Sequence, residues 1–111
     1  MAMAQDSVSA RLAPPPASAD VYTVPAGKTV SILGYALANV GTGDVNITVR
    51  WVDASAQVGG REYTVTNAVR VAAGETYYPL ATGFHLNEND VLRTVISAGM
   101  VDATLSIDIT P

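Results

Sequence analysis

The chain has 111 residues, of which 49% are hydrophobic and 14% charged, and its formal net charge at pH 7 is −4. This length suits one domain with a single core, and six scattered Lys and Arg residues argue against a protein that grips nucleic-acid phosphates. No apolar run reaches the length of a membrane span, and the lack of cysteine excludes disulfides and thiolate metal sites.

Residues 1–19 differ in composition from the rest of the chain. They are rich in Ala, Ser and Pro and end in a run of three prolines, Pro14 to Pro16, which favours an extended polyproline conformation. Val8 and Leu12 alternate with polar residues, so this stretch fits an edge strand on its own sheet or a neighbour's. We therefore predict an extended N-terminal arm at 1–19 and a β-sandwich domain at 20–111; a disordered tail is the alternative. The first residues lack a basic start and an apolar core, so we expect no secretory signal.

The pentads at 25–29 (PAGKT) and 72–76 (AAGET) each follow a valine and precede a new apolar run. In both, the Ala-Gly step supplies a residue that tolerates positive φ, and the β-branched Thr begins the next strand. We predict a turn between strands at each pentad. Lys28 is not expected to bind phosphate, because the pattern is strand–turn–strand rather than strand–loop–helix.

The segment 30–40 is apolar on both sides if it is a regular strand. Leu33, Tyr35 and Leu37 alternate with Ile32 and with two alanines. One face would pack inside, and the other would need a cover, supplied by the N-terminal arm or by another subunit.

Alternation with a period of two residues predicts the remaining strands. Apolar residues alternate with polar ones over 45–51, 63–71 and 101–109, and a further strand is predicted at 91–96. No window shows helical periodicity. Seven or eight short strands separated by turns predict an all-β, antiparallel two-sheet β-sandwich. Jelly-roll connectivity is favoured, and immunoglobulin-like connectivity stays open.

The residue types that carry chemistry are sparse. His85 is the only histidine, and no nucleophile motif accompanies it. Glu88 and Asp90 offer oxygens for Ca²⁺ but lack the spaced ligand series of a calcium loop, so we interpret them as a hairpin turn. We therefore predict no catalytic residues, no cofactor, no metal site and no enzymatic activity.

Aromatic residues suggest an alternative function. Trp51 is in phase with the apolar face of 45–51 and is expected in the core, whereas Tyr77 and Tyr78 fall on opposite faces of a strand. One of these tyrosines would be exposed and able to contact a partner or a sugar.

The segment 21–29 (VYTVPAGKT), the apolar strand ending in Asn39-Val40-Gly41-Thr42-Gly43 and the later segments 73–76 (AGET) and 90–92 (DVL) resemble small virion structural proteins of tailed bacteriophages. The resemblance covers roughly residues 21–109 and does not include the proline-rich arm. It implies a small β-sandwich module on a head, tail or fibre, without fixing the position, and it carries over no catalytic residues.

We therefore expect a capsid decoration or cement protein that binds the outer shell through its arm and sandwich faces. Its expected partners are the major capsid protein or other virion proteins, and we expect a homo-oligomer, with a trimer as one candidate. Its expected location is the virion, after synthesis in the host bacterial cytoplasm, without nucleic-acid or membrane partners. The alternatives are a tail, fibre or connector component and a carbohydrate- or surface-binding module. The predicted partner-binding residues are Val8, Leu12, Pro14, Pro15, Pro16, Leu33, Tyr35, Leu37, Tyr77 and Tyr78.

Overall fold

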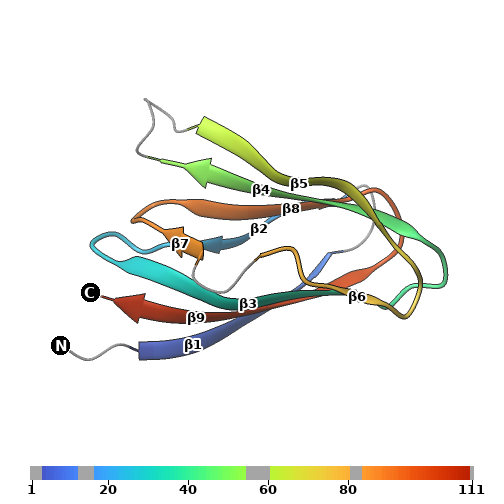
Figure 1. Cartoon of the computed structure of the whole chain (residues 1–111), viewed down its shortest axis with the longest axis horizontal. Helices are drawn as coiled ribbons and strands as arrows, with labels where there is room; N and C mark the ends of the chain where they lie inside the picture. The colour runs from blue at the N-terminus through green and yellow to red at the C-terminus, as the bar shows by residue number, and fades with distance from the viewer. Residues whose placement is uncertain (1–3, 13–16, 55–60, 81–83, 111) are drawn as a thin grey trace.

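A computed structural model describes residues 4–12, 17–54, 61–80 and 84–110, and over these residues the chain forms two antiparallel sheets without helix. The predicted all-β, two-sheet sandwich is confirmed. The strands run along the long axis of the molecule (Figure 1). They are β1 (Ala4–Leu12), β2 (Ala17–Thr23), β3 (Thr29–Asn39), β4 (Val45–Asp53), β5 (Arg61–Val71), β6 (Thr76–Tyr77), β7 (Phe84–Leu86), β8 (Val91–Ile96) and β9 (Val101–Thr110).

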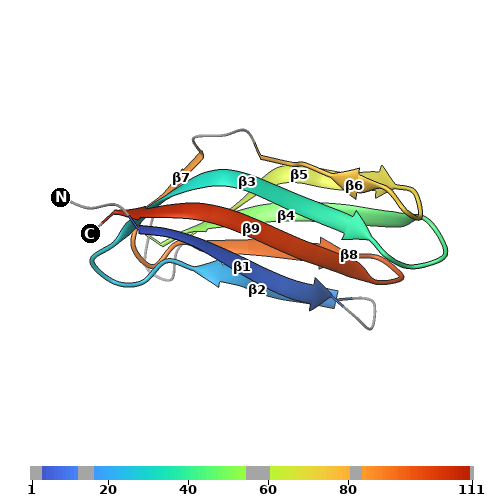
Figure 2. The ribbon, with the colours of Figure 1, turned by 90° about the horizontal axis from the view of Figure 1, so that it is seen from below.

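The two sheets are built by nested pairing of distant strands. Sheet A has the order β1-β9-β3-β6, with β7 also paired to β3, and sheet B has the order β2-β8-β4-β5. β4 pairs with β5, β3 with β6 and β7, β2 with β8 and β1 with β9. The chain is thus arranged as one long hairpin, with β1–β4 as one half and β5–β9 as the other. The hairpin is folded over so that each half contributes strands to both sheets (Figure 2).

The core lies between the sheets, and the alternating patterns supply it. Along β9, the buried residues are Val101, Ala103, Leu105 and Ile107, while the polar residues between them face outward. Val45, Ile47 and Val49 of β4 face them from sheet B. The predicted inward faces of these two strands are therefore confirmed.

A bulge in β3 corrects the prediction that Leu33, Tyr35 and Leu37 share a face. Ile32 lies opposite Ile107 of β9, but Gly34 lies opposite the next residue of β9, so Leu33 is an inserted residue. Beyond the bulge Tyr35 and Leu37 point into the core, at 1% and 0% exposure, while Leu33 is 37% exposed. A single inserted residue changes which side chains face outward.

A second irregularity corrects the predicted alternation of β5. Two residues, Asn67 and Ala68, stand opposite Thr48 of β4, and Ala68 has a φ of 48°. The Ala68 N–H donates to the Thr48 hydroxyl over 2.9 Å. A further register shift between Val49 and Arg50 makes Val65 an inserted residue, so Thr66 rather than Val65 lies opposite the buried Val49.

The N-terminal segment lies against the chain's own sheets. β1 pairs with β9 from Ala4 to Leu12 and forms the edge of sheet A. Leu12 is buried, at 2% exposure, and Val8 packs against the core. The predicted boundary at residue 19 falls within β2, which pairs with β8 on both sides of that position.

Both predicted pentad turns are confirmed. In the first, the Lys28 N–H donates to the Pro25 carbonyl and Gly27 has a φ of 77°; in the second, the Glu75 N–H donates to the Ala72 carbonyl and Gly74 has a φ of 83°. Glycine suits these third turn positions because it has no Cβ to clash at positive φ. The predicted turn at 87–90 has the same bond, from the Asp90 N–H to the Asn87 carbonyl.

A hydrogen bond between two buried side chains joins the middle of the two sheets. The hydroxyls of Tyr35 in β3 and Thr94 in β8 lie 2.6 Å apart, and both residues are buried. Burial raises the pKa of Tyr35 from 10.0 to about 12 by desolvating the phenolate, and the bond to Thr94 opposes this rise. Each hydroxyl thus satisfies the other in an otherwise apolar layer.

This pair predicts an alkaline loss of stability. An unfolded tyrosine ionises near pH 10 and the folded Tyr35 near pH 12, so between these values the unfolded state binds fewer protons and the free energy of unfolding falls. The full difference is about 3 kcal/mol. Urea unfolding should show about half of this difference between pH 9 and pH 11 in the natural chain, and a smaller decrease in Tyr35→Phe. An equal decrease in both proteins would contradict the assignment to Tyr35.

Candidate functional site

The outer face of sheet A carries small side chains in register across three strands. In its central row, Ser9 of β1 lies opposite Thr104 of β9, which lies opposite Ala36 of β3. The rows on either side are Arg11, Asp102 and Ala38, and Ser7, Ser106 and Gly34. We call these nine residues the small-residue face. Its short side chains leave the backbone of the sheet close to the surface.

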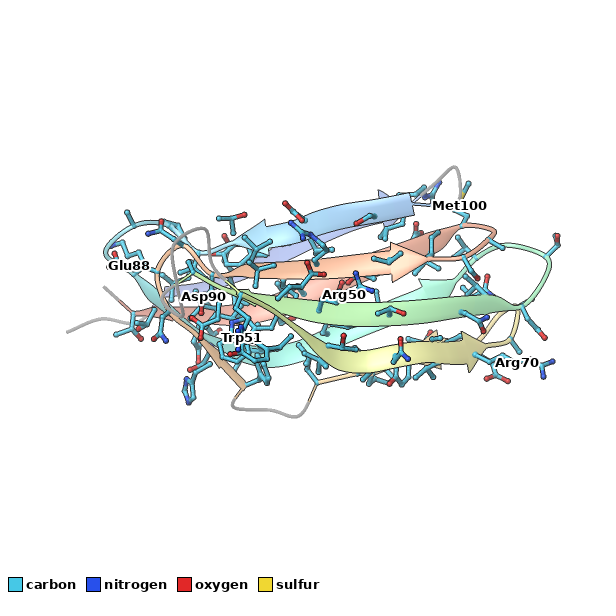
Figure 3. All side chains as sticks on the ribbon, turned by 90° about the horizontal axis from the view of Figure 1, so that it is seen from above. Arg50, Trp51, Arg70, Glu88, Asp90 and Met100 are labelled. Carbon is cyan, nitrogen blue, oxygen red and sulfur yellow. The ribbon has the colours of Figure 1, made fainter. Side chains whose placement is uncertain are left out.

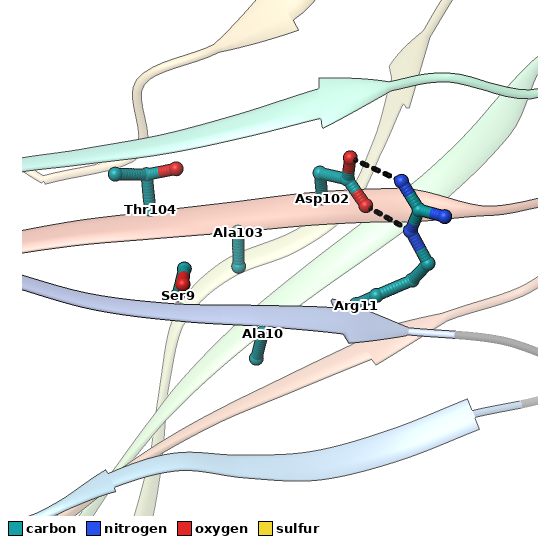
Figure 4. Close-up of a pocket in the computed structure, with 6 residues that line it drawn as sticks. All are labelled: Ser9, Ala10, Arg11, Asp102, Ala103 and Thr104. Carbon is teal, nitrogen blue, oxygen red and sulfur yellow. Dashed lines mark hydrogen bonds and ion pairs between the residues drawn. The ribbon is translucent and has the colours of Figure 1, made fainter.

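Two shallow hollows lie on this side of the molecule. The first is lined by Ser9, Ala10, Arg11, Asp102, Ala103 and Thr104 (Figure 4). The second is lined by Gln5, Asp6, Ser7, Leu33, Ser106 and Ile107. The Leu33 side chain, placed outward by the β3 bulge, thus stands beside the second hollow and adds apolar surface to a mainly polar face.

The two charged residues of the small-residue face, Arg11 and Asp102, neutralise each other. Arg11 Nε and Nη2 donate to the two carboxylate oxygens of Asp102 over 2.6 and 2.9 Å (Figure 4). This bidentate bond lowers the pKa of Asp102 and raises that of Arg11. The face therefore presents hydroxyls, methyl groups and one closed ion pair to solvent.

The outer face of sheet B is different, because an ion-pair network crosses it. Arg93 of β8 lies 2.6 Å from Asp20 of β2 and 3.1 Å from Glu62 of β5, and Glu62 lies 3.0 Å from Arg50 of β4. All four strands of the sheet are linked in this way, and Arg50 is seen on the face of the sheet in Figure 3. The hydrogen bond to Asp20 is the main cause of the raised pKa of Arg93. A partner covering this face would have to desolvate several charges.

One end of the sandwich is organised by Asp90, a buried carboxylate at 0% exposure. It accepts hydrogen bonds from the backbone N–H groups of Asn87 and Ala54, over 2.9 and 3.0 Å, and from the indole N–H of Trp51, over 3.1 Å. Trp51 and Asp90 lie side by side in Figure 3. The acidic turn predicted at 87–90 is therefore a structural turn whose carboxylate is used inside the chain.

Trp51 is half-buried rather than fully in the core as predicted. Its ring centroid lies 5.4 Å from that of Tyr63 in β5 and 5.9 Å from that of Phe84 in β7. The three rings thus connect the edges of the two sheets. The indole N–H of Trp51 needs a hydrogen-bond acceptor, and Asp90 supplies one. This bond holds the ring at the edge of the sandwich rather than deep in the apolar core.

The opposite end is organised by Asn39, which is also buried, at 1% exposure. Its amide Nδ2 donates to the carbonyls of Gly43 and Val71, over 2.8 and 3.0 Å, and its Oδ1 accepts from the Gly41 N–H over 3.0 Å. The backbone of Asn39 also exchanges two hydrogen bonds with the turn at 72–75. Sequence reasoning missed this role, although the Asn-x-Gly-x-Gly spacing was a signal for an amide-capped loop.

His85 lies on the outer side of sheet A and does not form a nucleophile triad. Its Nδ1 lies 2.9 Å from the hydroxyl of Ser31, and Asp108 stands opposite Ser31 in β9. A triad needs the imidazole between the hydroxyl and the carboxylate, whereas here the serine is the middle residue. This arrangement gives the serine no route to pass its proton to an imidazole oriented by the acid.

The predicted partner-binding residues are divided between core and surface. Leu12, Tyr35 and Leu37 are buried in the chain's own core, and Val8 packs against that core. Leu33 and Tyr78 reach solvent, at 37% and 69% exposure, whereas Tyr77 is half-buried. Pro14, Pro15 and Pro16 lie outside the described residues. The described members of the predicted set are therefore divided between core and surface, and partner binding by them stays a prediction.

Within the described ranges, no group of three or more His, Asp or Glu side chains is arranged to hold a metal ion. The same part of the chain contains no helix that is long and apolar enough to span a membrane.

Comparison with known proteins places the chain by its fold. No family model and no curated protein sequence matches it. A chain of the T13 viral particle of IBDV aligns with a TM-score of 0.60 at 10% identity, over 96% of this chain and 30% of that one. A chain in the acid-stable capsid structure of Helicobacter pylori bacteriophage KHP30 aligns with a TM-score of 0.50 at 13% identity, over 96% of this chain and 88% of that one.

A pilus protein has a similar fold. A chain of the disulfide-linked pili that form Bacillus endospore appendages aligns with a TM-score of 0.50 at 22% identity, over 96% of this chain and 85% of that one. The chain shares its fold with these proteins. It spans only 30% of the length of the chain from the T13 IBDV particle and 32% of the length of a similar chain from the Gx strain of infectious bursal disease virus.

Proposed function

We propose that the chain is a non-enzymatic, jelly-roll structural protein of a bacteriophage particle, and that it decorates the outer surface of the capsid. The observation that carries this proposal is the small-residue face of sheet A. Fold likeness to chains of the IBDV particle and of the phage KHP30 capsid supports a place in a virion. The low charge of 14% supports a surface that neighbouring molecules cover.

The small-residue face suits docking onto another protein surface. Ser, Thr, Ala and Gly lose little side-chain entropy when they are covered, and a face with one closed ion pair has few charges to desolvate. Sheet B, in contrast, carries the Asp20–Arg93–Glu62–Arg50 network. We therefore assign capsid docking to sheet A, with Leu33 as an apolar contact beside it.

The size of this face suits a protein present in many copies. Its three strands lie about 4.8 Å apart and each contributes about five residues, so the face covers a footprint of roughly 240 Å². A stable protein–protein interface buries about 800 Å² on each partner. One such contact is therefore weak, and a decoration protein reaches high occupancy by adding further contacts to neighbouring copies or shell subunits.

The test measures the copy number of the chain in purified particles and its dependence on sheet A. We expect copies in proportion to the major shell protein, and at least a tenfold loss of co-sedimentation with particles for Thr104→Arg, because a long charged side chain blocks close approach. Thr64→Arg, an exposed substitution on β5 of sheet B, is the matched control and should bind normally. A few copies at one vertex would favour a tail or connector component, and equal binding of both variants would exclude docking through sheet A.

A further inference from the structure

Strand β1 is held on the sandwich mainly by backbone pairing. It pairs with β9 in continuous register from Ala4 to Leu12 at the edge of sheet A. Among its described side chains, Leu12 alone is buried, and Val8 packs partly against the core. Arg11 adds the bidentate bond to Asp102. The strand can therefore be exchanged for an identical one without rearranging the core.

The sequence between β1 and β2 opposes a reversal of the chain. β1 and β2 belong to different sheets and run in opposite directions (Figure 2), and residues 13–16 connect them. That connection has the sequence Ala-Pro-Pro-Pro. Prolines in a row favour an extended helix that rises about 3.1 Å per residue, and a residue before proline is also biased toward extended conformations.

We propose that β1 of one molecule pairs with β9 of a second copy of this chain, in the register seen here. The exchanged strand makes the same contacts as the internal one: Leu12 enters the same core site, and Arg11 binds Asp102 of the second copy. Only the connection differs, and an extended proline run that need not reverse favours the exchanged form. Exchange of an identical element is a low-cost route to an oligomer. This inference does not depend on the virion role.

Because the natural chain has no cysteine, two single-cysteine variants test the exchange directly. Ser9 and Thr104 are opposed in the β1–β9 register and exposed. Ser9→Cys and Thr104→Cys chains are mixed in denaturant, refolded together at high concentration and treated with a short bifunctional thiol crosslinker. Reciprocal exchange should give covalent heterodimers containing roughly half of the chains, as in a statistically mixed dimer. A mixture of Ser9→Cys with Thr64→Cys is the control and should give at least tenfold fewer heterodimers.

The chain carrying both Ser9→Cys and Thr104→Cys shows that the two positions can be joined. If this double variant crosslinks within single molecules while the mixed single variants form no heterodimer, β1 stays on its own molecule and the proposal is overturned. Replacing Pro14, Pro15 and Pro16 with serine should lower the heterodimer yield several-fold, because serine has a weaker preference than proline for an extended connection. An unchanged yield would remove the prolines as the cause of exchange.

Discussion

Asp90→Asn should lower the free energy of unfolding by about 3 kcal/mol. The Asp90 carboxylate is buried and accepts three N–H groups, from Asn87, Ala54 and Trp51. Asparagine retains one acceptor oxygen and turns an amide N–H₂ toward donors, so at least one buried N–H loses its partner. Hydrogen bonds to a charged group contribute about 1.5–3 kcal/mol each, and an unsatisfied buried donor adds a further cost. Urea unfolding followed by far-ultraviolet circular dichroism measures the change.

Glu88→Gln is the matched control for this substitution. Glu88 is exposed, in the same turn, and its Oε2 accepts one bond from the Gly27 N–H over 2.6 Å, which the glutamine oxygen can also accept. We expect a change within about 0.5 kcal/mol. If Asp90→Asn were as mild as Glu88→Gln, the buried carboxylate would not organise this end of the sandwich. Fluorescence of Trp51, the single tryptophan, gives a second readout beside the substituted carboxylate.

Asn39→Asp should be at least as destabilising, by about 3–4 kcal/mol at neutral pH. The substitution keeps the shape of the side chain but replaces an amide that donates to the Gly43 and Val71 carbonyls with a carboxylate that cannot donate. Two carbonyls then face an unpaired, buried negative charge, and the loss of both hydrogen bonds adds to the cost. The midpoint of urea unfolding, at an unchanged slope, reports this effect.

The exposed Asn46 of β4 provides the comparison for Asn39. Asn46→Asp introduces the same charge on the outer side of sheet B, where water solvates it, and a change within about 0.5 kcal/mol is expected. Similar losses for the two variants would mean that net charge, not the amide network, determines the result. A much larger loss at Asn39 supports the role of this side chain in joining β3, the 40–44 loop and the end of β5.

The alternating patterns made the sheets predictable because a strand with one buried face and one exposed face alternates apolar and polar residues. β9 and residues 45–49 of β4 show this most clearly, and their buried faces are those predicted. The glycine-containing pentads were predictable for a related reason: positive φ at Gly27 and Gly74 is a local requirement that a few neighbouring residues reveal.

The register of a strand depends on the strand it pairs with, and the local sequence of one strand does not reveal that pairing. The inserted Leu33 places Tyr35 and Leu37 inside, and its detection requires knowledge of where β9 pairs. For the same reason the small-residue face could not be identified from β3 alone, since it forms only when β1, β9 and β3 are aligned. Asn39 and Asp90 also looked like ordinary turn residues, because their donors and acceptors come from segments that are distant in the sequence.

The nested hairpin has a consequence for folding during synthesis. β1 is made first among the described strands, but its partner β9 is made last. Sheet A therefore cannot close until nearly the whole chain has left the ribosome, and in the meantime β1 has no strand of its own molecule to pair with. Folds dominated by such long-range pairing fold slowly. If the strand exchange proposed above takes place, it would be favoured on a polysome, where the unpaired β1 of one nascent chain is held close to the completed β9 of its neighbour.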